Sequence, residues 1–134
     1  MDTTFRCEFR SIKGVPILVP EGGRAMIRAQ VAPGVLPERF GVVRGRAALR
    51  GPAARVELAQ GETDGILPNE GVPECVTGVV VEHLARGLLV DAGVLLHVEL
   101  PGELEPRRFK LGSRVSCHFS EQIAVEGVVL DPSL

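Results

Sequence analysis

The sequence predicts an all-β protein built from two similar halves, and three observations lead to this prediction. Glycine contributes 16 and proline 10 of the 134 residues, a high density of turn formers for so short a chain. Short apolar runs alternate with polar residues at a period of two, as half-buried strands require. Several short motifs also recur in the same order along the two halves, which indicates an internal repeat.

Five short strands are expected in the first half. The opening strand, 4–11, places Phe5, Cys7 and Phe9 on one face and charged residues on the other. Pro16 lies near the start of the next strand, 15–19, and proline in a strand favours an edge position. The remaining strands are predicted at 24–31, 44–49 and 53–58, the last two separated by Gly51-Pro52.

The second half repeats this organisation after a polar segment. Residues 59–73 are largely polar and rich in Gly and Pro, so we assign them to a linker between an N-terminal unit, 1–58, and a C-terminal unit, 74–134. Strands are predicted at 76–83, 87–91, 94–100, 114–119 and 123–130.

The two units share aligned landmarks. Cys7 and Cys75 lie 68 residues apart, as do the turns Pro33-Gly34 and Pro101-Gly102, and Phe40 and Phe109 are 69 apart. We therefore expect an internal duplication of a unit with about five strands, the number in a small Greek-key barrel. The predicted fold is two tandem five-stranded barrels packed together.

The C-terminal unit resembles a known RNA-binding repeat. Gly78-Val79-Val80, 87–93, 95–99 and 109–115 follow the order of motifs in the OB-fold repeat of a large small-subunit ribosomal protein, the "S-one" type. The resemblance implies an OB-like barrel that binds single-stranded RNA across its second and third strands. It also implies that Leu88, His97 and Lys110 lie on or near the binding face, although Leu88 occupies a position that is aromatic in that family.

Charge is distributed unequally between the units. Residues 1–58 carry ten Arg and Lys against five Asp and Glu, a balance of +5, and residues 59–134 carry five against twelve, a balance of −7. The basic excess includes an arginine stripe that we define as Arg24, Arg28, Arg44, Arg46, Arg50 and Arg55. Such a stripe either contacts the phosphates of a nucleic acid or forms ion pairs with the acidic unit, and the sequence leaves both interpretations open.

Motifs for catalysis and cofactor binding are missing. The chain has neither a Walker A loop nor a Gly-x-Ser-x-Gly elbow, and its three His and three Cys residues lack the spacing of a metal site. We predict a non-enzymatic protein without a metal or cofactor. The cysteine usage favours the cytoplasm, and no segment resembles a signal peptide or a membrane span.

Three functional hypotheses follow. The first is a module that binds single-stranded RNA or DNA through the arginine stripe, with His97 and Lys110 as further candidates. The second is an assembly module that docks a protein partner, or a second copy of itself, through sheet edges and charge asymmetry without nucleic acid. The third is a small-ligand module that holds an anion between the repeats.

Overall fold

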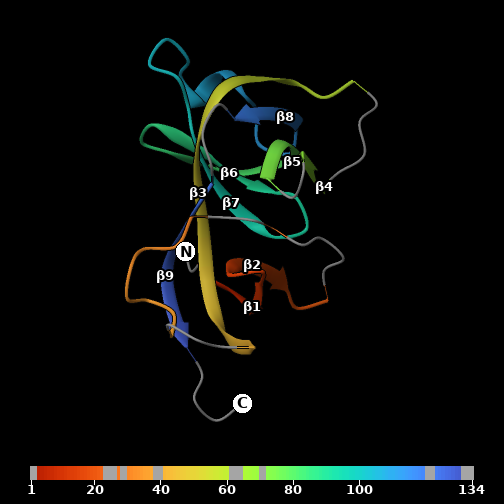
Figure 1. The fold of residues 1–134 in the computed structure, drawn as a ribbon. Helices are drawn as coiled ribbons and strands as arrows, with labels where there is room; N and C mark the ends of the chain where they lie inside the picture. Colours follow the sequence, from red (N-terminus) through yellow and green to blue (C-terminus); the bar gives the residue numbers. More distant parts are fainter. Residues whose placement is uncertain are drawn as a thin grey trace.

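The computed structural model describes residues 3–22, 27, 30–37, 41–60, 65–69, 72–119 and 123–130, without the side chains of 65–69, 72–74 and 127. This part of the chain is all-β, as predicted, with a single 3₁₀ turn, η1 (Pro106–Arg108) (Figure 1). Its strands are β1 (Phe5–Ile12), β2 (Val15–Pro20), β3 (Val42–Leu58), β4 (Gly65–Asn69), β5 (Val72–Leu84), β6 (Gly87–Asp91), β7 (Leu95–Glu99), β8 (Arg114–Phe119) and β9 (Ala124–Leu130). No helix of the described residues is long and apolar enough to cross a bilayer.

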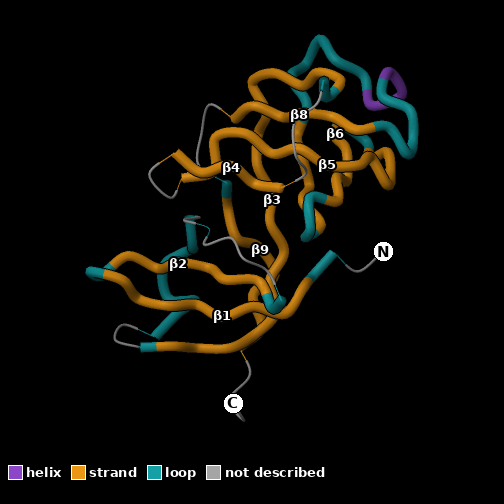
Figure 2. Tube along the Cα trace, turned by 90° about the vertical axis from the view of Figure 1, so that its right-hand side faces the viewer, coloured by secondary structure: helices purple, strands orange, loops and turns teal. Residues whose placement is uncertain are grey.

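Strand β3 connects two groups of strands. Its first half pairs with β1 on one edge and β9 on the other, and its second half pairs with β7 and β8. Figure 2 shows the result: β1, β2 and β9 lie in one group, β4, β5, β6 and β8 lie in the other, and β3 runs through both. Strand β7 joins the second group through its pairing with β6.

The pairing in the first group forms a circuit that is closed by two isolated bridges, at Ile27 and Gln30, while residues 28 and 29 lie outside the described residues. It runs from β3 through β1 to β2, where Leu18 and Ile27 exchange two backbone hydrogen bonds of 2.8 Å. Gln30 then bonds to the backbone at the start of β9, accepting from Val125 at 2.8 Å, and β9 returns to β3. The bridge between Gln30 and Ala124 is parallel, whereas the other contacts of this circuit are antiparallel.

The second circuit has the same pairing order when β5 is matched with β1 of the first circuit. From β5 it passes to β6 and β7, crosses by a parallel contact to the second half of β3, and returns through β8 to β5. Strand β9 follows β8 in the chain but completes the first circuit by pairing with the first half of β3. The second half of β3 in turn completes the second circuit by pairing with β8. Each circuit thus takes its final strand from the other part of the chain.

These pairs cross the predicted unit boundaries. Strand β9 belongs by sequence to 74–134 but pairs with β3, and β4 and the start of β5 lie in the segment assigned to a linker. The prediction of two strands at 44–49 and 53–58 is wrong, because β3 is continuous through Gly51-Pro52. Gly51 is a packing residue: an added Cβ would lie 3.0 Å from Ile123 and 3.1 Å from Phe119.

The inward face predicted for the first strand is confirmed at Cys7 and Phe9, which are buried. Leu18 of β2 and Ile27 are buried as well, and most of the predicted strand 24–31 lies outside the described residues. Most of the other buried apolar side chains come from β3, β5, β6, β7 and β8 and complete one continuous core. Phe5, predicted to be interior, is only half-buried at the edge of that core.

Candidate nucleic-acid interface

The described members of the arginine stripe all lie on the outer side of β3. Arg44, Arg46 and Arg50 alternate with the buried residues Gly45, Ala47 and Leu49, as the period of a strand requires. Arg55 is also exposed, because an irregularity between Ala53 and Arg55 shifts the alternation by one residue. Arg24 and Arg28 lie outside the described residues.

Arg50 and Arg55 are paired with carboxylates. Arg50 bonds to Glu99 of β7 and lies 3.7 Å from Glu126 of β9. Its hydrogen bond to Glu99 raises the pKa of Arg50 above its ordinary value. Arg55 lies 3.7 Å from Glu57, which is also 3.3 Å from His118. Arg50 therefore shows the pairing with the acidic unit that the sequence left as an alternative to phosphate binding, whereas Arg55 pairs with a carboxylate of its own unit.

The outer face of the β1–β3 pair remains cationic. Arg6 lies directly opposite Arg46, and Glu8 lies opposite Arg44. Glu8 is 2.8 Å from Arg10 and 3.3 Å from Arg44. Hydrogen bonding from Arg10 is the main reason that the pKa of Glu8 is lowered. We call this the cationic face and define it by Arg6, Glu8, Arg10, Arg44 and Arg46, four positive charges around one negative charge.

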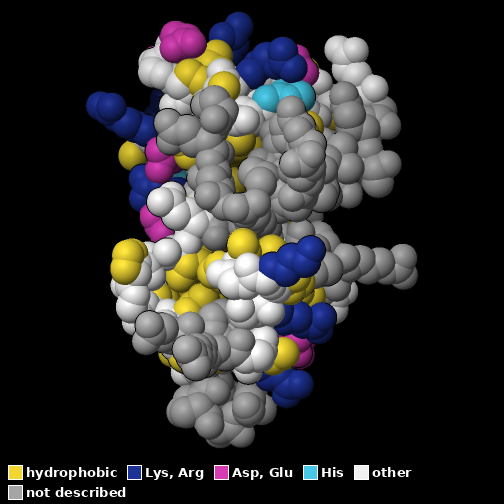
Figure 3. Space-filling model, viewed as in Figure 1, with side chains coloured by type: hydrophobic (Ala, Val, Ile, Leu, Met, Phe, Trp, Pro, Cys, Tyr) yellow, Lys and Arg dark blue, Asp and Glu magenta, His cyan; other side chains and the backbone are white. Residues whose placement is uncertain are grey.

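Figure 3 shows Lys and Arg side chains gathered along one side of the lower half of the molecule, where β1 and β2 lie. Arg46 also donates to the Thr4 hydroxyl at 3.4 Å. The ion pairs to Glu8 join exposed side chains, so they cost little to exchange for contacts with a ligand.

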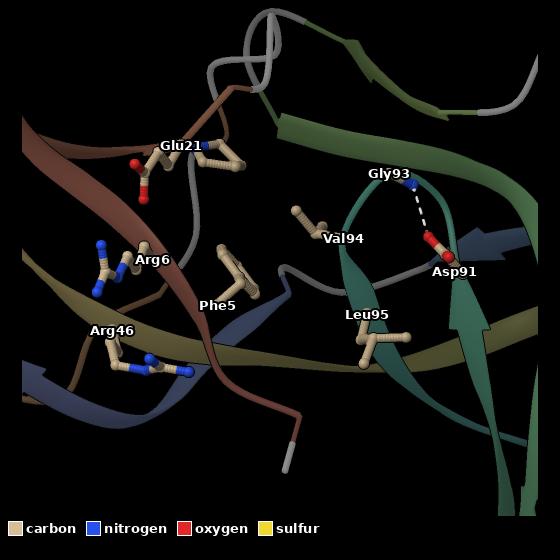
Figure 4. Close-up of a pocket in the computed structure, with 9 residues that line it drawn as sticks. Phe5, Arg6, Glu21, Arg46, Asp91, Gly93, Val94 and Leu95 are labelled. Atoms are coloured by element: carbon tan, nitrogen blue, oxygen red, sulfur yellow. Dashed lines mark hydrogen bonds between the residues drawn. The ribbon is translucent and has the colours of Figure 1, made fainter. Parts of the chain in front are cut away.

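A hollow of about 490 Å³ opens at one end of the cationic face. Its lining comes from both circuits: Phe5, Arg6, Pro20, Glu21 and Arg46 from the first, and Asp91, Gly93, Val94 and Leu95 from the second. Figure 4 shows Phe5 between the two arginines on one side and Val94 and Leu95 on the other. On the same side as Val94 and Leu95, and farther from Phe5, Asp91 accepts a 3.0 Å hydrogen bond from the Gly93 amide.

No family model, curated protein or solved structure matches this chain. The candidate site therefore rests on its own geometry.

The residues carried over from the ribosomal repeat are not brought together with the cationic face. Leu88 is fully buried, so the expectation that it lies on a binding face is wrong. His97 lies beside Arg50 on the paired part of the surface, and burial and Arg50 lower its pKa. Lys110 is exposed in the loop before β8, where its carbonyl accepts bonds from the backbone amide and hydroxyl of Ser113.

Sequence reasoning missed Phe5 and Arg6. Phe5 was placed in the core by alternation, but it is the first residue of β1, where the core ends. The alternation of β1 predicts that Arg6 points outward, but only the register between β1 and β3 shows that it faces Arg46.

Among the described residues, no three His, Cys, Asp or Glu side chains gather as a metal site requires.

Proposed function

We propose that this protein is a non-catalytic module that binds single-stranded nucleic acid, with the phosphate backbone along the cationic face. The observation that carries the proposal is the arrangement of four guanidinium groups around one carboxylate on two adjacent strands. Arginine forms bidentate contacts with phosphate oxygens, and such contacts give affinity without reading sequence.

The spacing of the cationic face supports a linear polyanion. Outward residues of one strand repeat every two positions, about 7 Å apart, and neighbouring strands lie about 5 Å apart. Arg44 and Arg46 are such a pair on β3, and Arg6 and Arg10 flank Glu8 on β1. A single strand crossing this face meets a cation at each of several successive phosphates.

We infer that each closed circuit is a small OB-like barrel and that the two arose by duplication. The two circuits have the same pairing order with one parallel contact each; the second has five strand members, and in the first the isolated bridges at Ile27 and Gln30 hold the place of the strand β7. Cys7 and Cys75 lie on β1 and β5, which hold the same place in the two circuits. OB barrels commonly bind single strands, and this agrees with the proposed ligand.

The proposal is tested by the anisotropy of a fluorescein-labelled short oligodeoxycytidylate, titrated with protein between about 50 and 200 mM salt. Four phosphate contacts predict a slope of log affinity against log salt of about −3. The double variant Arg6→Gln with Arg46→Gln should halve that slope. Arg107→Gln, an exposed arginine in η1, serves as the matched control and should leave it unchanged. Absence of binding at the lowest salt overturns the proposal.

A protein partner is the second candidate, and exposed aliphatic side chains beside the cationic face favour it. Ile12, Val42 and Val129 are 42%, 55% and 65% exposed, respectively. Val129 lies opposite Arg46 and Val42 lies opposite Arg10. If Val42→Ser no longer binds the protein partner but keeps its affinity for the oligonucleotide, this surface is a protein interface.

A further inference from the structure

The hollow beside the cationic face differs from it in chemistry. Its lining combines the apolar residues Phe5, Val94 and Leu95 with two acidic residues, Glu21 and Asp91. A phosphate is repelled by these carboxylates, so the cationic face is the better place for the backbone. The lining instead suits a flat, weakly polar group with hydrogen-bond donors on its edge.

We propose that the hollow binds one nucleobase of the bound strand, stacked on Phe5, and prefers bases that carry an exocyclic amino group. This inference rests on the proposed function. A base extends from the sugar–phosphate backbone, and Arg6 and Arg46 line both the hollow and the cationic face. The phosphates beside the bound base therefore lie against these two arginines while the base enters the hollow.

Size and stacking support this ligand. About 490 Å³ is within the range of small-molecule sites and holds a single nucleotide. Bases stack on aromatic side chains in most single-strand binders, and Phe5 contributes the aromatic ring among the residues that line the hollow. Val94 and Leu95 lie across from it and supply apolar contacts to the opposite face of the base.

The carboxylate of Asp91 gives the preference among bases. Its Oδ1 accepts from the Gly93 amide, which fixes the side chain in the turn between β6 and β7 that lines one side of the hollow (Figure 4). An ionised carboxylate only accepts hydrogen bonds, and cytosine offers the N4 amino group as a donor where uracil and thymine have a carbonyl oxygen. Cytosine, adenine and guanine, which carry an exocyclic amino group, are therefore favoured over uracil and thymine.

The test compares oligodeoxycytidylate, oligothymidylate and an abasic strand of equal length on the wild-type protein and on Phe5→Leu. Phe5→Leu should weaken oligodeoxycytidylate binding roughly tenfold, the loss expected from one stacking contact, with the salt slope unchanged. The abasic strand should bind both proteins equally, which also shows that the variant is folded. Asp91→Asn keeps an oxygen for Gly93 and should remove the preference for cytosine over thymine.

Two outcomes separate this inference from the proposed function. If the wild-type protein binds the abasic strand as tightly as oligodeoxycytidylate, the base pocket is refuted while backbone binding stands. If no strand binds at low salt, the proposed function is overturned, and this inference is overturned with it. Equal affinity of the wild-type protein for cytidylate and thymidylate overturns the assigned base preference.

Discussion

Arg6 and Arg46 lie directly opposite each other on the antiparallel strands β1 and β3, and both line the hollow between the two circuits. Like charges at directly opposed positions destabilise a strand pair. An arrangement that costs stability is expected where it serves binding, because functional sites are the places where local rules are broken.

Replacing Arg6 should therefore weaken binding without weakening the fold. Arg6→Gln removes the like charge opposite Arg46, and we expect the free energy of unfolding to stay constant or rise by up to about 0.5 kcal/mol. The same variant should lower oligonucleotide affinity at low salt. Arg10→Gln is the control on the same face of β1, because it removes an ion pair to Glu8 and so gains no stability. Urea unfolding of both variants checks the difference, and a clear loss of stability in Arg6→Gln contradicts it.

The alternation of side chains was enough to predict most strands. Strands β6 and β8 have the predicted bounds, and β1, β2 and β9 differ by one residue at one or both ends. The error at Gly51-Pro52 has a local cause, since glycine and proline usually mark turns. Here glycine makes room for Phe119 and Ile123, and the sequence around Gly51 contains neither of them.

The binding site was harder to predict because it depends on register. The sequence identified arginines on the outside of β3, but whether each is paired depends on its neighbours on β1, β7 and β9. Arg50 meets Glu99 and Glu126, which lie 49 and 76 positions later in the chain. Arg46 faces Arg6 across the strand pair and donates to the Thr4 hydroxyl. No pattern within one strand distinguishes these two surroundings.

Gly78 lies where β5 passes close to the end of β6, and we expect it to be intolerant of a side chain. A Cβ at Gly78 would clash with the carbonyl oxygen of Asp91, a backbone atom that cannot move alone. Gly78→Ala should lower the free energy of unfolding by about 2 kcal/mol or more. Gly102→Ala, with no atom within 4 Å of the new Cβ, should change it by less than about 0.5 kcal/mol. Equal urea midpoints for the two variants contradict the close approach.

His97 should make stability fall in mild acid. Burial and the nearby Arg50 lower its pKa, with Glu99 and Glu126 acting in the opposite direction. The folded state therefore favours the neutral ring. As pH drops below about 6.5, the unfolded chain takes up the proton first, and stability is lost until the folded ring is protonated as well. The decrease in melting temperature between about pH 7.5 and 5.5 should be smaller in His97→Gln than in the wild-type protein. An equal decrease in both proteins would assign the pH dependence to other groups.

The three cysteines should differ in reactivity toward a small aromatic disulfide reagent. Burial raises the pKa of Cys7 to about 11 and is the main cause that raises the pKa of Cys117 to about 12, so both remain protonated and covered at neutral pH. Cys75 is only partly buried on β5. The folded protein should release one equivalent of reporter thiolate quickly, and Cys75→Ser should abolish that phase while Cys7→Ser retains it. Rapid release of more than one equivalent from the folded protein contradicts the burial of the other two.

The exchange of final strands predicts that neither predicted unit folds alone. A fragment of residues 1–58 lacks β9, together with the fully buried Ile123 that precedes it. A fragment of residues 59–134 lacks β3, whose second half pairs with β7 and β8 and carries Val56 into the core. Each fragment would expose apolar faces and unpaired strand edges, so circular dichroism should show little ordered sheet in either. Mixed together, the two fragments contain every strand of both circuits and should recover the sheet spectrum and elute as one complex. A 59–134 fragment that melts cooperatively on its own would show that the second circuit closes without β3.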